Sequence, residues 1–243
     1  MIRSPLRSVA TFAALSFTLL TLGSSSASAQ PHQRWAQSGD NELRVRFGVF
    51  TPDGDGEYFA DKFVDFTGQA ADFEDGAFAV EYTRDLLPLL DLVVSGGAYE
   101  GIQEQRYRDY EDDRGNAIAH TTSLEINHLE AGLRLRLGPP HARLLPYVVG
   151  GVGLYSYRLS EDGDFIDFTP PPPTVFEDRF EAEGAAAGWF AAAGLQVAVT
   201  RNTSFFAEGR WRRAEDELGD DFSEFGTLDL SGRELALGVA WRF

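Results

Sequence analysis

The sequence predicts an all-β protein that folds as an eight-stranded antiparallel up-and-down transmembrane β-barrel. Three observations point to this fold class. Segments of about ten residues alternate between apolar and polar side chains, as strands do. The connections between these segments are alternately short and long, and aromatic residues gather near the ends of the apolar faces. No stretch after residue 29 reaches the ~18 consecutive apolar residues that a transmembrane helix needs.

The amino terminus carries the pattern of a secretory signal peptide. Arg3 and Arg7 give a basic start, residues 9–22 are predominantly apolar, and small residues then lead to Ala27-Ser28-Ala29. This order predicts cleavage after Ala29, with Ala27 and Ala29 as the small residues of the cleavage site. A membrane anchor is the alternative, but the apolar run is short for one. The expected domains are a signal peptide at 1–29, a periplasmic lead-in at 30–41 and the barrel domain at 42–243.

Composition and charge exclude several classes of function. The formal net charge is −17, which disfavours a nucleic-acid partner because phosphate binding needs a basic surface. The sequence contains no Cys, so disulfides and thiolate metal ligands are excluded. None of the four His residues has metal-ligand spacing, and we expect no cofactor.

The last strand shows the alternation most clearly. From residue 233 onward, one face is small or charged and the other is apolar, and the chain ends on an aromatic residue. A period of two predicts a strand with one lipid-facing side. The apolar face carries Leu235, Leu237, Val239, Trp241 and Phe243.

Seven further segments repeat this alternation with turn residues between them. Four long connections are expected to be loops, at 51–75, 100–120, 159–184 and 214–227, and the third contains a run of four prolines that cannot join a sheet. The eight predicted strands cover residues 43–50, 76–84, 90–99, 122–137, 146–158, 185–199, 204–213 and 228–243.

Three details stay open in the sequence. Leu124 and Ile126 are out of phase with the apolar face that follows, so either a bulge lies near residues 127–128 or both line the upper interior. The strand at 146–158 has an ambiguous facing, and we favour Val148, Val152 and Leu154 outward. The Ala-rich segment 185–199 is compatible with a buried helix, but its glycines and flanking turns favour a strand.

Alternation alone does not separate a membrane barrel from a soluble one. Here the polar faces consist mostly of Gly, Ala and charged residues, which suits a narrow interior that is filled. Aromatic rings prefer the two lipid–water interfaces, and the apolar faces carry them at both ends: Phe205, Trp241 and Phe243 at one end, Trp189 and Trp211 at the other.

Together, the signal peptide, the eight alternating strands, the stretch 146–153 (PYVVGGVG) and the terminal Phe243 resemble the family of outer-membrane β-barrel domains. This family includes the OmpA-type and OmpW-type small barrels of Gram-negative bacteria, and the resemblance covers about residues 42–243. It implies a location in the outer membrane, among outer-membrane lipid and lipopolysaccharide. It also implies that Val239, Trp241 and Phe243 resemble the assembly signal read by the barrel-assembly machinery.

Charged residues on the inward faces predict an interior charge ladder, a set of ion pairs that plugs the barrel. Buried charges must be paired, because an unpaired one costs several kcal/mol. A charge-lined permeation path is the alternative. The predicted ladder consists of Arg44, Arg46, Glu81, Glu130, Arg134, Arg136, Glu208, Arg210, Arg212, Glu234 and Arg242.

The four expected loops hold 27 acidic residues against five basic ones, counting the second from residue 101. We interpret them as a solvated surface. Weak divalent-cation binding next to lipopolysaccharide is the alternative, since oxygen-rich clusters suit Ca²⁺ or Mg²⁺. The best candidates are residues 53–57 and 162–164.

For function, we expect a barrel with a structural or surface-contact role and no enzymatic activity. The first alternative is OmpW-like passage of small hydrophobic molecules, with Leu124, Ile126 and the aromatics of residues 58–66 lining an upper pocket. The second is an enzyme acting on lipid A, for which Ser123, His128 and Glu130 are the combination to examine.

Overall fold

The computed structural model describes residues 39–112, 114–139, 142–169 and 172–243. The predicted signal peptide, including Ala27 and Ala29, and all but the last residues of the predicted lead-in lie outside these ranges.

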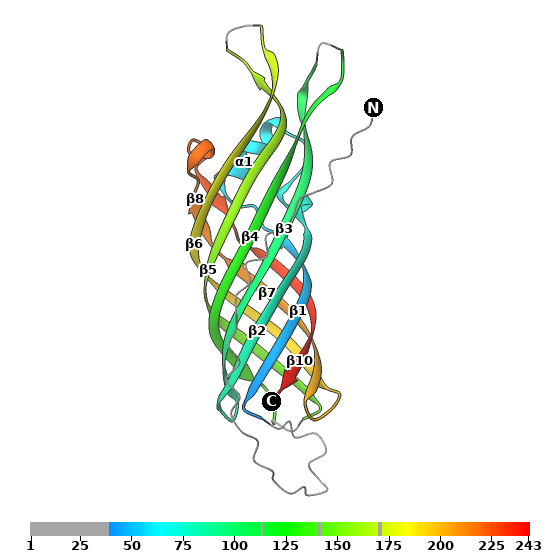
Figure 1. Ribbon diagram of the computed structural model, residues 1–243, viewed down its shortest axis with the longest axis vertical. Helices are drawn as coiled ribbons and strands as arrows, with labels where there is room; N and C mark the ends of the chain where they lie inside the picture. The colour runs from blue at the N-terminus through cyan, green and yellow to red at the C-terminus, as the bar shows by residue number, and fades with distance from the viewer. Residues whose placement is uncertain (1–38, 113, 140–141, 170–171) are drawn as a thin grey trace, which may run out of the picture. The chain divides into compact units, whose positions relative to one another are not determined.

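Eight strands close into one antiparallel barrel, as predicted (Figure 1). Each strand pairs with its neighbour along the chain, and the first strand closes on the last. Within the described ranges, no helix has the length and apolarity to cross a membrane. The barrel strands are β1 (Asn41–Pro52), β2 (Asp75–Leu87), β3 (Leu90–Glu111), β4 (Ala117–Arg136), β5 (Leu144–Asp167), β6 (Thr174–Ala198), β7 (Thr203–Arg213) and β10 (Gly232–Arg242).

The central four strands are longer than expected. Residues 100–120 and 159–184 were expected to be loops, but both are mostly strand, so that the β3–β4 and β5–β6 hairpins rise above the rest of the barrel (Figure 1). The alternation continues there, because Ile118, Leu159 and Phe165 point inward and are buried. The outward residues become polar once the wall leaves the lipid, which makes such a segment resemble a loop in sequence.

The other two long connections fold over the barrel mouth. Between β1 and β2 lie the helix α1 (Glu57–Asp65) and the 3₁₀ turn η1 (Ala70–Phe73). Between β7 and β10 lie the short strands β8 (Glu215–Glu217) and β9 (Thr227–Asp229), which pair with each other, and the 3₁₀ turn η2 (Asp220–Phe222). The predicted last strand therefore began too early, since residues 228–229 belong to β9 and β10 starts at Gly232.

The structure settles the three details that the sequence left open. The register of β4 is continuous past residues 127–128 on both sides, so no bulge is present and Leu124 and Ile126 point inward, fully buried. Val148 and Val152 of β5 point outward, and the segment 185–199 is strand through residue 198.

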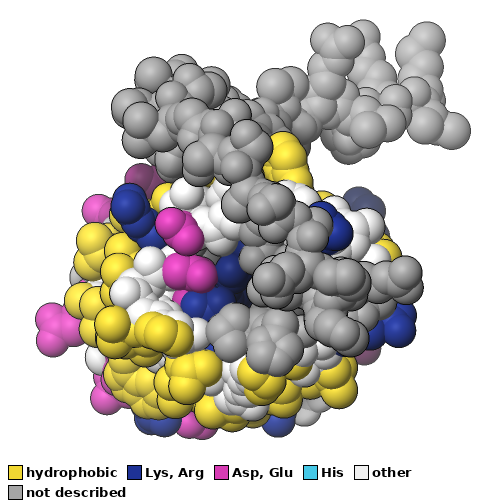
Figure 2. Space-filling view, turned by 90° about the horizontal axis from the view of Figure 1, so that it is seen from below, with side chains coloured by type: hydrophobic (Ala, Val, Ile, Leu, Met, Phe, Trp, Pro, Cys, Tyr) yellow, Lys and Arg dark blue, Asp and Glu magenta, His cyan; other side chains and the backbone are white. Residues whose placement is uncertain are grey.

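The outer wall is apolar and its aromatic residues lie at two levels. Trp241 and Phe205 are more than half exposed near the end where the chain terminates, and Trp189 and Trp211 are equally exposed further up. Viewed from the end that carries the carboxyl terminus, hydrophobic side chains occupy much of the visible outer rim, with some charged side chains among them, and Arg and acidic side chains lie in the centre (Figure 2). This inside-out arrangement is what a lipid solvent requires.

Candidate functional site

The candidate site is the barrel lumen, into which every residue of the predicted ladder points. None of the eleven residues is more than 5% exposed, although all are ionisable. Burial of so many charges is tolerated only where they are paired and hydrogen-bonded. The lower part of the lumen, defined here as the ionic layer, contains these eleven residues and the partners described below.

At the centre of the ionic layer, Arg44 of β1 connects three other strands. Its guanidinium pairs with Glu81 of β2 and donates to the hydroxyl of Tyr147 on β5 at 2.6 Å. The Tyr147 hydroxyl in turn donates to Glu208 of β7 at 2.9 Å. The contacts thus cross the bore from wall to wall.

Like Arg44, Arg210 of β7 connects several strands at this level of the lumen. It pairs with Glu130 of β4, with Glu81 at 3.3 Å and with Glu208 at 3.0 Å. Its guanidinium also lies 4.6 Å from the centre of the Phe190 ring, a cation–π distance. One arginine therefore contacts three carboxylates on three strands.

At the lower end, the arginines bind acids that the prediction did not include. Arg134 contacts Asp91 at 2.8 Å and Glu42 at 2.9 Å. Arg136 reaches Asp91 at 2.6 Å, and Arg242 reaches Asp85 at 3.1 Å. Two of the missed acids carried a readable signal, because Glu42 and Asp91 share the inward parity of their strands.

The three added acids balance the charge of the network. The predicted ladder has seven arginines and four glutamates, and Glu42, Asp85 and Asp91 bring the carboxylates to seven. Charge neutrality inside a low-dielectric barrel is expected on energetic grounds, since an excess buried cation costs several kcal/mol. Asp85 lay in a predicted turn, where no parity rule applied.

Small residues make room for this layer at two close approaches. A Cβ at Gly194 would lie 2.3 Å from the Tyr147 hydroxyl, and a Cβ at Gly238 would lie 2.2 Å from the ring of Phe206. Glycine at these positions lets large side chains cross the bore of a narrow barrel.

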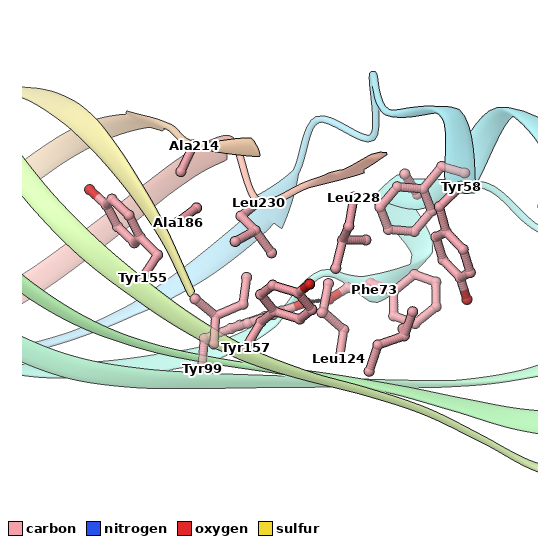
Figure 3. Packing of buried hydrophobic residues seen from close by; sticks show 14 of the residues in the cluster. Tyr58, Phe73, Tyr99, Leu124, Tyr155, Tyr157, Ala186, Ala214, Leu228 and Leu230 are labelled. Atoms are coloured by element: carbon pink, nitrogen blue, oxygen red, sulfur yellow. Dashed lines mark hydrogen bonds between the residues drawn. The ribbon is translucent and has the colours of Figure 1, made fainter. Parts of the chain in front are cut away.

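Above the ionic layer lies an aromatic layer, which we define as the buried apolar cluster of the upper lumen (Figure 3). Arg212 stands at the boundary, 3.8 Å over the ring of Phe50 and 3.9 Å from Glu234 below. The connections supply much of the aromatic layer: α1 contributes Tyr58 and Phe59, which pack in one cluster with wall residues that include Leu124, Ile126, Tyr99, Tyr155 and Tyr157.

One polar cluster is buried within the upper lumen, nine positions beyond the lipid-facing Leu129 on β4. Lys62 of α1 pairs with Glu161 of β5 and lies 3.1 Å from Nε2 of His120 on β4. The Tyr58 hydroxyl donates to Glu161 at 2.6 Å. We call Lys62, His120 and Glu161 the mouth cluster. No sequence pattern predicts it, since its members come from three distant segments.

Burial sets the protonation of the mouth cluster. Desolvation lowers the pKa of His120 to about 4, helped by the neighbouring Lys62 ammonium and opposed by Glu161. Desolvation also lowers the pKa of Lys62, against the attraction of Glu161. At neutral pH His120 is therefore uncharged beside a lysine–glutamate pair.

Sequence and structure comparisons now assign the family. Residues 17–243 match the model of the outer membrane protein β-barrel domain. The chain belongs to this family. No curated protein sequence matches it.

Solved structures with this fold have little sequence in common with the chain. The outer membrane protein OprG from Pseudomonas aeruginosa aligns with a TM-score of 0.51 at 10% identity, over 86% of this chain and 98% of OprG. Neisserial surface protein A aligns with a TM-score of 0.47 at 13% identity, over 85% and 98%. Ail of Yersinia pestis aligns with a TM-score of 0.44 at 14% identity, over 85% and 100%. At these identities the comparison with OprG supports the barrel fold, and the family places the protein in the outer membrane.

The residues considered for a lipid A-modifying triad do not meet. Ser123 lies on the outward parity of β4, whereas His128 points into the lumen. Neither ring nitrogen of His128 has a hydrogen-bond partner among the described residues. A nucleophile and base must lie within hydrogen-bond reach, so this combination forms no triad.

The residues of the predicted assembly signal and of the candidate cation sites lie at the end of β10, before α1 and on β5. Val239, Trp241 and Phe243 lie on the outward face at the end of β10. Residues 53–57 lead into α1, and residues 162–164 lie on β5. Among the residues that the structure describes, no group of three or more His, Asp or Glu side chains is arranged to hold a metal ion.

Proposed function

We propose that this protein is a closed outer-membrane barrel with a structural or surface-contact role, which carries two tall acidic hairpins above the membrane. The observation that carries the proposal is the filling of the lumen by two successive layers, one ionic and one aromatic. The family supports the barrel and its location, and the contacts inside the lumen support its closure.

The ionic layer opposes permeation because its contacts run across the bore. An ion moving through the lumen would have to separate Arg44 from Glu81 or Arg210 from Glu130, and each separation exposes two buried charges. Breaking a buried pair by removing one partner typically costs about 3–5 kcal/mol. The narrow bore of an eight-stranded barrel leaves little space beside these side chains.

The aromatic layer closes the same path a second time. Tyr58 and Phe59 of α1 are each 1% exposed, and Leu124 and Ile126 on the wall beneath them are fully buried. These four residues are among those that the alternative of hydrophobic passage placed around an open pocket. Because they pack in one cluster, a closed upper lumen is favoured over passage of hydrophobic molecules.

The hairpins supply the surface for contact. Acidic residues dominate the tall parts of β5 and β6, with Asp162, Asp164 and Glu177 on the outward face against Arg179. This charge pattern suits a cationic surface or a cation-bridged lipopolysaccharide as the neighbour. We propose that the hairpins make contacts of this kind. We also propose that the barrel-assembly machinery recognises the end of β10, as the family leads us to expect.

Planar-bilayer recording tests the closure. We expect no single-channel current from the refolded protein at neutral pH, and none from a variant that lacks residues 57–65, because the ionic layer remains. A variant that combines this deletion with Arg44→Ala, Tyr147→Ala and Arg210→Ala should conduct. The same deletion with Val45→Ala, Val148→Ala and Trp211→Ala on the outer face is the matched control. A steady current from the unmodified protein would refute the proposal.

A further inference from the structure

Lys62 is the only lysine in a chain that otherwise uses arginine as its base. It is also one of the most buried polar residues of the upper lumen, at 4% exposure. Arginine is rarely deprotonated in proteins, whereas lysine responds to burial. The one titratable ammonium of the side chains therefore sits where α1 meets the barrel wall.

The mouth cluster provides the polar attachment of α1 to the wall. Lys62 pairs with Glu161, Tyr58 donates to the same carboxylate, and Lys62 Nζ lies 3.1 Å from His120 Nε2. His120 is itself held between aromatic rings, stacked 5.1 Å from Phe165. A helix of nine residues is too short to be stable by itself in water, so these contacts and its two buried rings hold α1 in place.

The segments on either side of α1 have anchors of their own. Before the helix, the amide of Asp55 donates to Asp229 at 2.9 Å. After the helix, the amide of Thr67 donates to the carbonyl of Arg106 at 2.9 Å. Release of the mouth cluster would thus free the helix between two fixed points, as a hinged lid.

The net charge of the mouth cluster is close to zero at neutral pH and rises by one on acidification. With His120 neutral, Lys62 and Glu161 cancel. A proton added to His120 leaves two cations facing one carboxylate. The buried cluster then carries an uncompensated positive charge, which burial penalises.

No nearby group offsets that charge at the same position. Within the described residues, the ionisable groups that interact with the cluster from the packed elements are two phenols. Tyr58 of α1 is already bonded to Glu161. Tyr107 of β3 lies near Glu161 and near Asp65 of α1, and the Asp65 side chain is exposed to solvent.

We propose that α1 is an acid-released lid: uptake of a proton by His120 within the mouth cluster frees the helix from the barrel mouth and exposes the aromatic layer. The sign follows from the direction of the shift. Burial lowers the pKa of His120 from 6.5 to about 4, so its contribution to closure is complete above 6.5 and is lost as the pH falls toward 4. The inference goes beyond the proposed closed barrel, because the ionic layer below remains shut.

Amide hydrogen exchange of the detergent-refolded full chain tests the lid. After correction for intrinsic rates, we expect residues 57–66 to exchange at least about tenfold faster at pH 4.5 than at pH 7.5, the factor that one pKa unit represents. Residues 43–49 of β1 should change little. Equal protection of 57–66 at both pH values would overturn the proposal.

Two variants test whether His120 is the residue whose protonation releases the lid. His120→Gln should reduce the acid-induced gain in exchange of residues 57–66 by about tenfold or more, because the neutral amide of glutamine takes up no proton in this pH range. His128→Gln, at the other buried lumen histidine, is the matched control and should leave the release unchanged. Release of His120→Gln at the pH of the unmodified chain would overturn the role of the cluster.

Glu161→Gln gives an independent readout at neutral pH. This substitution removes the carboxylate that pairs with Lys62, so the lid should loosen at pH 7.5. A lysine-specific protease should then cut the chain once, after residue 62. The unmodified chain should resist under the same conditions, and resistance of Glu161→Gln equal to it counts against the lid. Bilayer recordings keep the two proposals apart: a current at pH 7.5 refutes the closed barrel, whereas unchanged exchange refutes the lid.

Discussion

The ionic and aromatic layers fill the same lumen by different physical means. In the ionic layer the barrel wall supplies both partners of each contact, and glycines such as Gly194 and Gly238 leave room for the long side chains. In the aromatic layer the wall supplies one side and the connecting segments supply the other. The first layer is therefore part of the barrel, whereas the second depends on segments that can move relative to it.

The comparison is tested most severely by removing one hub of the ionic layer. Arg210→Met should lower the free energy of unfolding by about 3–5 kcal/mol, because the buried carboxylates of Glu130, Glu81 and Glu208 each lose one cationic partner. Urea unfolding in lipid vesicles measures this. Arg213→Met, at the exposed end of the same strand, is the control and should change stability by less than about 0.5 kcal/mol. Similar values for both would show that the ionic layer contributes little to stability.

In the aromatic layer, the expected effect is large but local. Phe59→Ala removes a ring that is 1% exposed, a change that costs about 3–5 kcal/mol in a protein core. Here we expect the loss to appear as faster hydrogen exchange of residues 57–73, with little change in exchange of β1. Val64→Ala on the exposed side of α1 is the control. Global loss of protection would mean that the two layers unfold as one unit.

A smaller effect is expected from crowding the ionic layer. A methyl group at Gly238 meets the Phe206 ring at 2.2 Å and the carbonyl of Val45 at 2.4 Å, so Gly238→Ala should cost about 1–3 kcal/mol. Gly76→Ala, whose methyl group meets nothing within 4 Å, is the matched control. The measurement is the same urea titration, and equal stability of the two variants would contradict the packing described for the bore.

The smallest thermodynamic effect is expected outside both layers. Phe243 is 48% exposed, so Phe243→Ala should change the free energy of unfolding by less than about 1 kcal/mol. If the terminal aromatic serves assembly, the same variant should lower the amount of folded barrel in the membrane of cells, measured by heat-modifiable mobility on gels. Leu237→Ala on the same face is the control.

Sequence reasoning succeeded wherever a strand touches lipid on one side and the lumen on the other. The alternation of Leu235, Leu237 and Val239 against small residues predicted the last strand and its facing, and the structure confirms both. It failed where that contrast ends. Above Leu129 the outward residues of β4 turn polar, so a wall that continues as strand resembled a loop.

Two properties decide which lumen residues can be predicted from the sequence: the inward or outward position of a residue along its strand, and how close its partners lie in the chain. Each arginine of the predicted ladder could be assigned from its position along a strand, and the same parity places Glu42 and Asp91 on the inner face. The mouth cluster was out of reach, because Lys62 and Glu161 are 99 residues apart and no periodic pattern links a helix in a connection to a strand. Tertiary contacts of connections leave no such trace in a single sequence.

The pairing of β4 with β5 ends at His120 and Gly163, although each strand continues with its other neighbour. Beyond this fork the two hairpin tips are bridged in the described residues by side chains, such as Tyr110 against Phe168 at 5.2 Å and Tyr107 accepting from the amide of Ile166 at 3.3 Å. Residues at either tip can thus be replaced or inserted without shifting the hydrogen-bond register of the wall. Such a fork lets the part of the molecule that meets its surroundings diverge rapidly while the cylinder beneath is inherited unchanged.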